Sequence, residues 1–264
     1  MNELPELKEA DIRAVFDSIV EPALNWNMNA LNLLKSVEVE GRKVKIRAHV
    51  VTADIDQLNE LRLEVVEKLS LLSPESVELN LRRVDVETEG TLGVSQIILV
   101  GSGKGGVGKS SVAVNVAASL KRQGYSVGLM DADIYGPSIP VLMEVKGRPE
   151  VLPHEYLMPI TAHGIKTMSV GYILGKDRAA DWRGVVVTST LLQFIQRTLW
   201  GELDYLVVDL PPGTGDIQLS LAQRLNISGV LLVTTGHAVA LSDVRRFWEM
   251  CTKREIPIIG LVEN

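Results

Sequence analysis

The sequence predicts an α/β protein in which a mostly parallel, doubly wound sheet follows a small α+β domain. From Ser95 onward, short apolar segments alternate with stretches of helical periodicity, the pattern of strands that are buried on both faces. The first 90 residues instead give the pattern α-β-β-α-β. A glycine-rich segment, residues 101–111, stands between an apolar strand and a helix, where α/β proteins bind ligands. With 264 residues, the chain is long enough for both domains.

The first domain is expected over residues 1–90. Apolar residues recur at helical spacing before Pro22 and before Pro74, and two alternating segments flank Gly41 as in a hairpin. In chain order, the expected elements are a helix over 9–20, strands over 36–41 and 42–51, a helix over 55–72 and a strand over 77–86. Residues 88–93, TEGTLG, have the composition of a linker.

The second domain is expected over residues 91–264. Its strands are expected where the chain is mostly apolar, namely over 96–100, 126–130, 205–209, 230–234 and 257–262. The stretch that follows the glycine-rich segment, SSVAVNVAASLKRQG, has the composition of a helix. The segment thus joins the first of these strands to a helix.

The glycine-rich segment contains a phosphate-binding motif. Residues 103–110, GKGGVGKS, match the pattern G-x-x-x-x-G-K-[ST] at every position. Glycines allow the backbone to turn its N–H groups toward a polyphosphate, and the N-terminus of the following helix favours the same anion. Lys109 is expected to contact the phosphates of ATP, and the Ser110 hydroxyl to ligate Mg²⁺. The nucleotide-binding residues predicted here are Gly103, Lys104, Gly105, Gly106, Val107, Gly108, Lys109, Ser110 and Ser111.

A second lysine, Lys104, follows the first glycine of the motif. Because Lys109 already supplies a cation to the phosphates of its own loop, Lys104 is better suited to a nucleotide held by another subunit. The segment resembles the deviant phosphate-loop ATPases, which include the septum-positioning, plasmid-partitioning and nitrogenase iron-protein families. That resemblance implies a homodimer that encloses ATP, with Lys104 and Lys109 as catalytic residues.

Acidic residues are expected at the edge of the sheet that carries this loop. Asp131 and Asp133 follow one apolar strand, and Asp209 ends another. Asp209 has the placement of a Walker B acid that holds Mg²⁺ through water, and Asp131 is expected to orient the waters of the metal. In the deviant ATPases the second aspartate of the DAD motif supports hydrolysis, so the resemblance assigns that catalytic role to Asp133. Residues 211–215, PPGTG, have the composition of a loop that senses the γ-phosphate.

The last residue, Asn264, follows an apolar strand. A single amide can both accept from and donate to the N6/N7 edge of adenine. In related ATPases an asparagine at this place contacts the base, so Asn264 is predicted to bind the nucleotide.

Several longer stretches narrow the resemblance. GSGKGGVGKSSVAVNVAASL, DADIYGPSIP, ADWRG, GELDYLVVDLPPGTGDIQLSLAQ and VTTGHAVALSDVRR closely resemble the Mrp/ApbC iron–sulfur cluster carrier ATPases over nearly all of residues 95–264. The N-terminal domain resembles, more weakly, the small α/β domain that precedes the ATPase in bacterial members. The resemblance implies an ATP- and Mg-dependent, weakly hydrolysing carrier that is a homodimer and transfers clusters to apo iron–sulfur client proteins.

The cysteine content departs from this family. Its members carry a C-x-x-C pair shortly after the V-E-N strand, and two subunits use those four thiolates to hold a [4Fe–4S] cluster. This chain stops at Asn264, before that position, so the expectation is a C-terminally shortened member without the cluster ligands. Cys251, the one cysteine, lies in an apolar helical pattern that favours burial rather than ligation.

Composition limits the other functions that the chain could have. A net charge of −6 argues against a nucleic-acid partner, and the lack of a long apolar segment argues against a membrane partner. The N-terminus does not resemble a secretory signal and there is a single cysteine, so the cytoplasm is the expected location. Two alternatives remain open, a non-catalytic nucleotide-sensing scaffold and a septum- or partition-type positioning ATPase.

Overall fold

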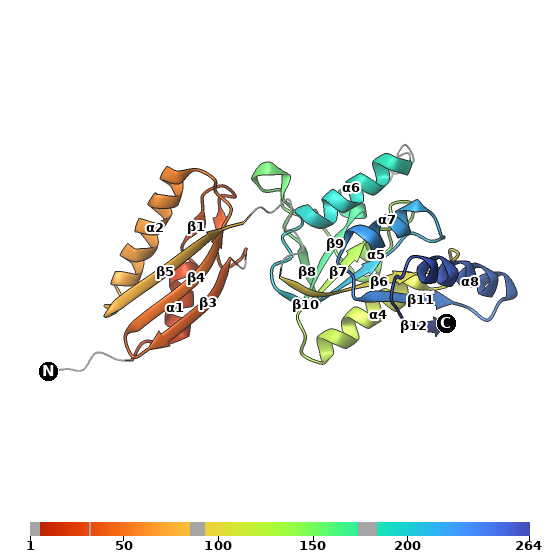
Figure 1. Ribbon diagram of the computed structural model, residues 1–264, viewed down its shortest axis with the longest axis horizontal. Helices are drawn as coiled ribbons and strands as arrows, with labels where there is room; N and C mark the ends of the chain where they lie inside the picture. The colour runs from red at the N-terminus through yellow and green to blue at the C-terminus, as the bar shows by residue number, and fades with distance from the viewer. Residues whose placement is uncertain (1–5, 32, 85–92, 174–183) are drawn as a thin grey trace. The chain divides into compact units, whose positions relative to one another are not determined.

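The computed structural model describes residues 6–31, 33–84, 93–173 and 184–264 (Figure 1). Packing divides the chain into two compact units, one of residues 1–89 and 151–156, the other of residues 90–150 and 157–264. Most of the expected linker, 88–93, and most of the ADWRG stretch, 180–184, lie outside the described residues.

The N-terminal unit contains a three-stranded sheet, a separate two-stranded ladder and two helices. Its elements are α1 (Glu9–Phe16), β1 (Val20–Glu21), β2 (Trp26–Asn27), β3 (Leu34–Glu40), β4 (Lys43–Val50), α2 (Ile55–Ser70) and β5 (Ser76–Arg83). The sheet has the order β3-β4-β5, with β3 antiparallel and β5 parallel to β4. Every second residue of β4 is buried, and buried side chains of α1 and α2 (Ile12, Phe16, Leu61, Val65 and Leu69) complete this core.

The first helix differs from the prediction. It was expected over residues 9–20 but ends at Phe16, and Val20–Glu21 instead pairs with Trp26–Asn27 in an antiparallel ladder. The side chain of Glu21 explains the change, because it is fully buried and its carboxylate accepts hydrogen bonds from the backbone N–H groups of Leu24 (2.8 Å) and Thr52 (2.7 Å). A polar residue directly after the expected helix is therefore a tertiary anchor here, and its ladder takes up the last residue of that range, Val20.

The second unit contains a seven-stranded sheet. Its elements are β6 (Val94–Gly101), α4 (Lys109–Arg122), β7 (Val127–Asp131), α5 (Ile139–Leu142), β8 (Ile160–Ala162), β9 (Ile165–Ser169), α6 (Gly184–Arg197), β10 (Leu203–Asp209), α7 (Asp216–Arg224), β11 (Gly229–Thr234), α8 (Ala238–Lys253) and β12 (Ile258–Glu263). Short 3₁₀ turns lie at Pro153–Glu155 and Val170–Tyr172. The strand order is β12-β11-β6-β10-β7-β9-β8, and every pair except β8–β9 is parallel. The expected mostly parallel sheet is confirmed.

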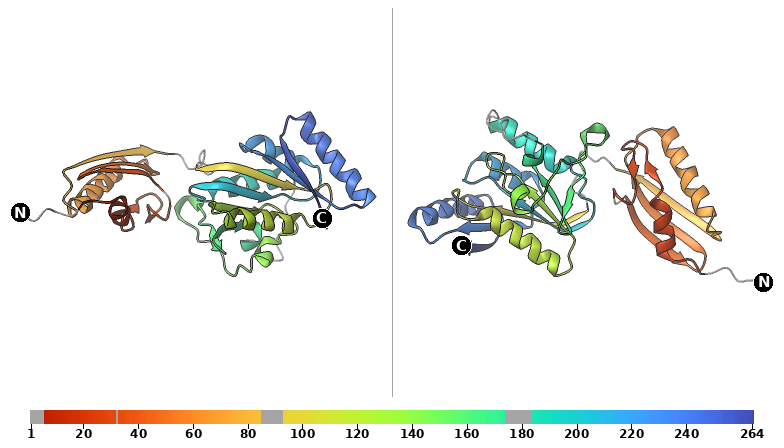
Figure 2. Two further views of the ribbon diagram at one scale, coloured as in Figure 1. Left: turned by 90° about the horizontal axis from the view of Figure 1, so that it is seen from below. Right: turned by 180° about the vertical axis from the view of Figure 1, so that it is seen from behind.

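Helices cover both faces of this sheet (Figure 2). Consecutive residues of β6 show the two layers, because Leu99 belongs to the core beneath α6, α7 and α8, whereas Val100 packs in the core beneath α4 and α5. Strands β8 and β9 were not predicted. They interrupt apolar with polar residues, and β8 is a short edge strand, so neither has the continuous apolar run of a central strand.

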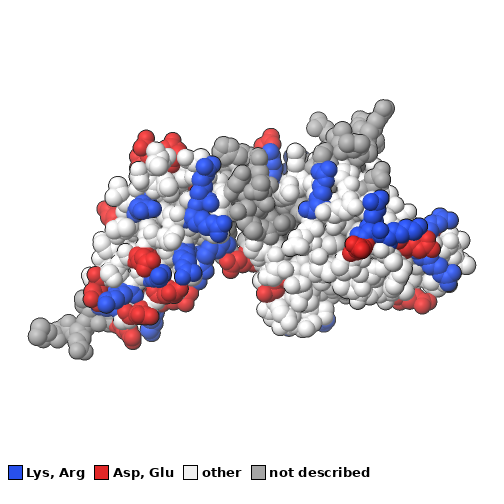
Figure 3. All heavy atoms as spheres, in the orientation of Figure 1, with Lys and Arg blue, Asp and Glu red and all other residues white. Residues whose placement is uncertain are grey.

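Charged side chains of both signs are interspersed on the face of the molecule drawn in Figure 3. In the N-terminal sheet, Lys45 of β4 lies 3.2 Å from Glu78 of β5, and Arg47 lies 3.8 Å from Glu38 of β3. Among the described residues, no helix has both the length and the apolar character needed to cross a membrane.

Candidate nucleotide site

The expected site residues of the second unit meet at the carboxyl ends of three adjacent strands. β10 lies between β6 and β7, and its last residue, Asp209, is in register with Val100 of β6 and Asp131 of β7. The phosphate-binding motif follows β6 and leads into α4. The structure therefore brings together the motif and the acidic residues that the sequence places more than twenty residues apart.

Two glycines give the loop its shape. Gly106 and Gly108 have φ angles of 80° and 87°, a left-handed conformation that L side chains rarely adopt. Gly108 is also the N-cap residue of α4, so the left-handed turn comes directly before the helix N-terminus. A third glycine has another role, because a Cβ on Gly103 would lie 2.3 Å from the backbone carbon of Asp243 in α8. The motif is thus shaped by its own backbone and by a helix packed against it.

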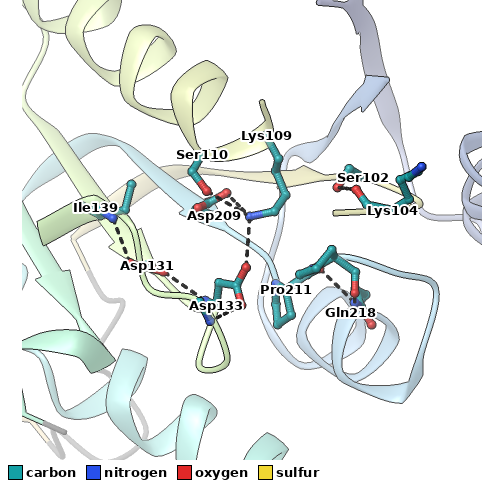
Figure 4. Close-up of polar contacts among 12 residues, drawn as sticks. Ser102, Lys104, Lys109, Ser110, Asp131, Asp133, Ile139, Asp209, Pro211 and Gln218 are labelled. Carbon is teal, nitrogen blue, oxygen red and sulfur yellow. Dashed lines mark hydrogen bonds and ion pairs between the residues drawn. The ribbon is translucent and has the colours of Figure 1, made fainter. Parts of the chain in front are cut away.

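Lys109 is buried and points at carboxylates (Figure 4). Its Nζ lies 2.5 Å from Oδ1 of Asp209 and 3.8 Å from Oδ2 of Asp133, and it donates to the Ser110 hydroxyl at 3.3 Å. Asp209 is fully buried, and its second oxygen, Oδ2, has no hydrogen-bond partner among the described residues. Burial raises the pKa of Asp209, and the positive charge of Lys109 opposes that rise.

The carboxylate of Asp131 accepts hydrogen bonds from three different residues. Its carboxylate accepts from the backbone N–H groups of Asp133 and Ile139, each at 3.1 Å, and from the Ser169 hydroxyl at 3.0 Å. Burial, followed by the nearby negative charge of Asp209, raises the pKa of Asp131 to about 7. These contacts fix the 131–139 turn, while the role of Asp131 in ordering metal-bound water stays a prediction.

Lys104 points away from Lys109 and the carboxylates (Figure 4). Its side chain is exposed and makes no ion pair with any residue in the described parts of the chain. Its backbone is held, because the Ser102 hydroxyl donates to the Lys104 carbonyl at 2.9 Å. A side chain in this position is free to reach a group outside its own loop, and its contact with the nucleotide of another subunit stays a prediction.

Asn264 lies beside the phosphate-binding motif. Its side-chain Nδ2 donates to the Val107 carbonyl at 3.1 Å, and its backbone N–H donates to Thr234 of β11 at 2.9 Å. A Cβ on Gly108 would stand 2.1 Å from that Nδ2, so the amide occupies the space that the glycine leaves. The structure therefore places Asn264 at the motif's backbone, and contact with adenine stays a prediction.

Three polar residues of the site were not predicted. Ser169 holds Asp131 from β9, Ser102 holds Lys104, and Gln218 of α7 donates its Nε2 to the carbonyls of Pro211 (3.0 Å) and Pro212 (3.3 Å). Ser102 and Gln218 lie within stretches that resemble the carrier family, but no expected chemistry singled out any of the three residues. The one available signal is position, since Ser102 comes directly before the motif and Gln218 three residues after PPGTG.

Cys251 is buried in α8, as expected. Burial raises the pKa of its thiol to about 11, which disfavours the thiolate that a metal would need. Among the residues that the structure describes, no three His, Cys, Asp or Glu side chains are grouped so as to hold a metal ion.

Comparison with known proteins yields consistent relatives. A family model described as ParA: NUBPL iron-transfer P-loop NTPase matches residues 93–264. The chain is 40% identical to the iron-sulfur cluster carrier protein of Deinococcus radiodurans, with 98% of this chain and 75% of that protein aligned. It is 39% identical to the protein of the same name from Escherichia coli K12, over 98% of this chain and 73% of that protein.

Two further matches extend the comparison. The iron-sulfur cluster transfer protein NUBPL of Mus musculus is 44% identical over 74% of this chain and 63% of that protein. Among solved structures, a nucleotide-binding protein of Archaeoglobus fulgidus in complex with ADP is similar, with a TM-score of 0.56 and 36% identity over 67% of this chain and 70% of that one.

Proposed function

Because this chain belongs to the ParA-type family of iron-transfer P-loop NTPases, we propose that it binds and hydrolyses ATP and uses this cycle to carry iron–sulfur clusters to apoproteins. The family membership confirms the resemblance that the sequence predicts. Relatives of nearly full-length similarity are named as cluster carriers, and the second unit has the P-loop NTPase fold.

The contact between Lys109 and Asp209 is the observation that carries the ATPase part of the proposal. The ammonium stands 2.5 Å from the carboxylate, directly beneath the N-terminus of α4 where the phosphates of a nucleotide would bind. Phosphates offer Lys109 several negative charges in place of one. ATP binding would therefore move the ammonium toward the β- and γ-phosphates and leave Asp209 available for a second cation.

The residues present fit Mg²⁺ as that cation. The ion prefers oxygen ligands and keeps several of its waters, and the Ser110 hydroxyl and the unpartnered Oδ2 of Asp209 are both oxygens at this edge of the sheet. Ser110 would hold the ion directly and Asp209 through water, with Asp131 ordering further waters as the sequence predicts. When bound, Mg²⁺ neutralises charge on the phosphates.

Hydrolysis needs positioning rather than a strong base. Asp133 lies 3.8 Å from Lys109, and its Oδ1 accepts from the backbone N–H of Gly136 at 3.2 Å, which holds the carboxylate close to Lys109. We assign to Asp133 the orientation of the attacking water. The exposed Lys104 would act on the nucleotide of a second copy of the chain, so hydrolysis would require a homodimer.

The cluster is the cargo of this cycle, and the apoproteins that accept it are the partners. We propose that the nucleotide state controls its delivery, because the phosphate site and the 211–215 segment belong to the same sheet edge. Cys251 is not assigned as a ligand, since its thiol is buried and its pKa is raised to about 11.

ATP binding, measured by calorimetry with and without Mg²⁺, tests the proposed site. Lys109→Ala is expected to weaken binding about ten- to hundredfold, because it removes a charge-assisted contact to phosphate. Lys121→Ala, which removes an exposed cation from the same helix, is the matched control and should leave the affinity unchanged. Equal affinities for the two variants would refute the phosphate-loop assignment.

A further inference from the structure

The side chain of Gln218 holds the segment that follows Asp209. Gln218 lies in the first turn of α7 and is 4% exposed. Its Nε2 donates to the carbonyls of two consecutive residues, Pro211 at 3.0 Å and Pro212 at 3.3 Å (Figure 4). Both acceptors are carbonyl oxygens, so only the NH₂ end of the amide can face them, and the orientation of the amide is fixed.

The held segment is joined to the phosphate-binding motif. Directly after the two prolines, the backbone N–H of Gly213 donates to the Ser102 carbonyl at 2.9 Å. The Ser102 hydroxyl in turn donates to the Lys104 carbonyl at 2.9 Å. Hydrogen bonds, joined by the chain itself at Pro212–Gly213 and within Ser102, therefore lead from α7 to the backbone of the lysine proposed to act across a dimer.

The other end of the amide is unsatisfied. Oε1 of Gln218 is buried and has no hydrogen-bond partner among the described residues. A buried carbonyl oxygen without a donor is unfavourable and rare in native proteins. This oxygen lies near Gly215, since a Cβ on Gly215 would stand 3.5 Å from Oε1, whereas the Nε2 end lies nearer Gly213, whose added Cβ would stand 3.9 Å from Nε2. Backbone N–H groups that could satisfy Oε1 are thus within the same short segment.

We propose that Gln218 is a positioning residue with two arrangements, a role that rests on the proposed ATPase function. In the arrangement seen here, its NH₂ group fixes the prolyl carbonyls while Oε1 is free. When the γ-phosphate draws the 213–215 backbone toward the site, Oε1 accepts a hydrogen bond from one of that segment's N–H groups. The same amide stabilises both positions of the segment and so sets how readily it responds to ATP.

Hydrogen exchange of the peptide that covers residues 213–217, combined with steady-state ATPase kinetics, tests this role. Gln218→Met keeps the length of the side chain and removes both the donor and the free acceptor. Gln223→Met makes the same change at an exposed glutamine of the same helix and is the matched control. Each protein is measured nucleotide-free, with ADP, and with the non-hydrolysable analogue adenylyl imidodiphosphate.

Without nucleotide, Gln218→Met is expected to speed exchange in this peptide roughly five- to tenfold, the effect of losing one or two neutral hydrogen bonds. In the parent, exchange should differ between ADP and the analogue, and Gln218→Met should abolish that difference. In kinetics, kcat should fall roughly tenfold while KM for ATP changes less than about twofold. Gln223→Met should match the parent in every measurement.

The possible failures of the two proposals can be told apart. If the parent hydrolyses no ATP, the proposed function fails, and exchange in the nucleotide-free state still decides whether Gln218 holds the segment. Unchanged exchange in Gln218→Met, or equal changes in Gln223→Met, would overturn the positioning role. If Gln218→Met does not fold, hydrogen exchange of the 213–217 peptide in the parent protein still tests the proposal. Equal exchange with ADP and with the analogue would refute the second arrangement.

Discussion

Replacing Lys109 with methionine is expected to destabilise the nucleotide-free protein more than replacing its partner Asp209 with asparagine. Lys109 is 6% exposed and Asp209 is fully buried, and their charged atoms are 2.5 Å apart. Methionine keeps most of the aliphatic stem but leaves the Asp209 carboxylate buried without its cation and beside Asp131. Asparagine at 209, in contrast, leaves Lys109 with Asp133 at 3.8 Å and removes the repulsion between two carboxylates.

The two losses should differ by several kcal/mol. Removing one partner of a buried ion pair, so that the other charge is uncompensated, costs about 3–5 kcal/mol. Losing one hydrogen bond while the cation keeps another carboxylate costs about 1 kcal/mol. In a domain of this size, about 1 kcal/mol lowers Tm by roughly 2–4 °C, so Lys109→Met should melt roughly 6–20 °C lower and Asp209→Asn only a few degrees lower.

Differential scanning calorimetry without nucleotide or Mg²⁺ measures these shifts. The double variant should melt close to Asp209→Asn alone, because with asparagine at 209 the loss of the Lys109 ammonium leaves no uncompensated carboxylate at that position. Lys121→Met, at an exposed lysine of α4, controls for the change of residue type. The reasoning is refuted if Lys109→Met has the same Tm as Lys121→Met, because the ion pair then does not stabilise the site. It is also refuted if Asp209→Asn has a lower Tm than Lys109→Met.

The loss caused by Lys109→Met should also depend on pH. Lys109 lowers the pKa of Asp209, so its removal raises that pKa further above the value of the unfolded chain. A carboxyl with a raised folded-state pKa favours folding below that pKa and loses this contribution as the pH rises through it. The loss should therefore be smaller at about pH 5.5 than at about pH 8, and an equal loss at both would rule out an uncompensated Asp209 as its cause.

The remaining predictions concern the dimer, the buried acid and the cluster. Lys104→Ala should keep ATP affinity within about threefold while ATP-dependent dimerisation and hydrolysis fall; identical dimerisation of parent and variant by light scattering would exclude the action across subunits. Asp131→Asn should gain stability relative to the parent as the pH rises from about 4 to about 7, because the pKa of Asp131 is raised to about 7 and its protonated form favours folding. The gain in the free energy of unfolding should not exceed about 4 kcal/mol, and parallel curves of Tm against pH for the two proteins would contradict the prediction. Anaerobic reconstitution of residues 1–264 should yield no stable [4Fe–4S] cluster, since two copies supply two thiols and each is the buried Cys251; stoichiometric iron and sulfide would show that other ligands serve.

Strands buried on both faces could be predicted from the sequence, whereas short edge elements could not. The central strands lie within one or two residues of the expected ranges, because a continuous apolar run has few alternatives to a buried strand. The ladder of Val20–Glu21 with Trp26–Asn27 was missed, since its stability comes from the contacts that Glu21 makes with residues three and more than thirty positions away. Local sequence carries no record of such contacts.

In the site, too, the positions of residues could be predicted from the sequence, whereas their contacts could not. The motif spacing fixed the place of Lys109 next to the helix N-terminus, and the apolar strands fixed Asp131 and Asp209 at one edge of the sheet. What the sequence did not indicate is which group each side chain contacts. Ser169 reaches Asp131 from 38 residues away, and the Lys109–Asp209 pair spans 100 residues, so both contacts follow from strand order rather than from any local pattern.

The charge at this edge of the sheet explains why the nucleotide site is built around an ion pair. Two carboxylates, those of Asp133 and Asp209, pair with the ammonium of Lys109, and Asp131 lies beside Asp209. Burial raises the pKa of Asp131 and of Asp209. Such a cluster favours any additional positive charge, whether a proton or a metal ion. If phosphates draw Lys109 away, Asp209 loses its cation, and the unfavourable energy of the buried, uncompensated carboxylates must be offset at the same moment. A nucleotide that brings its own divalent cation meets that requirement and one without it does not. We therefore expect this arrangement to favour the metal complex of ATP over metal-free ATP, through electrostatics alone.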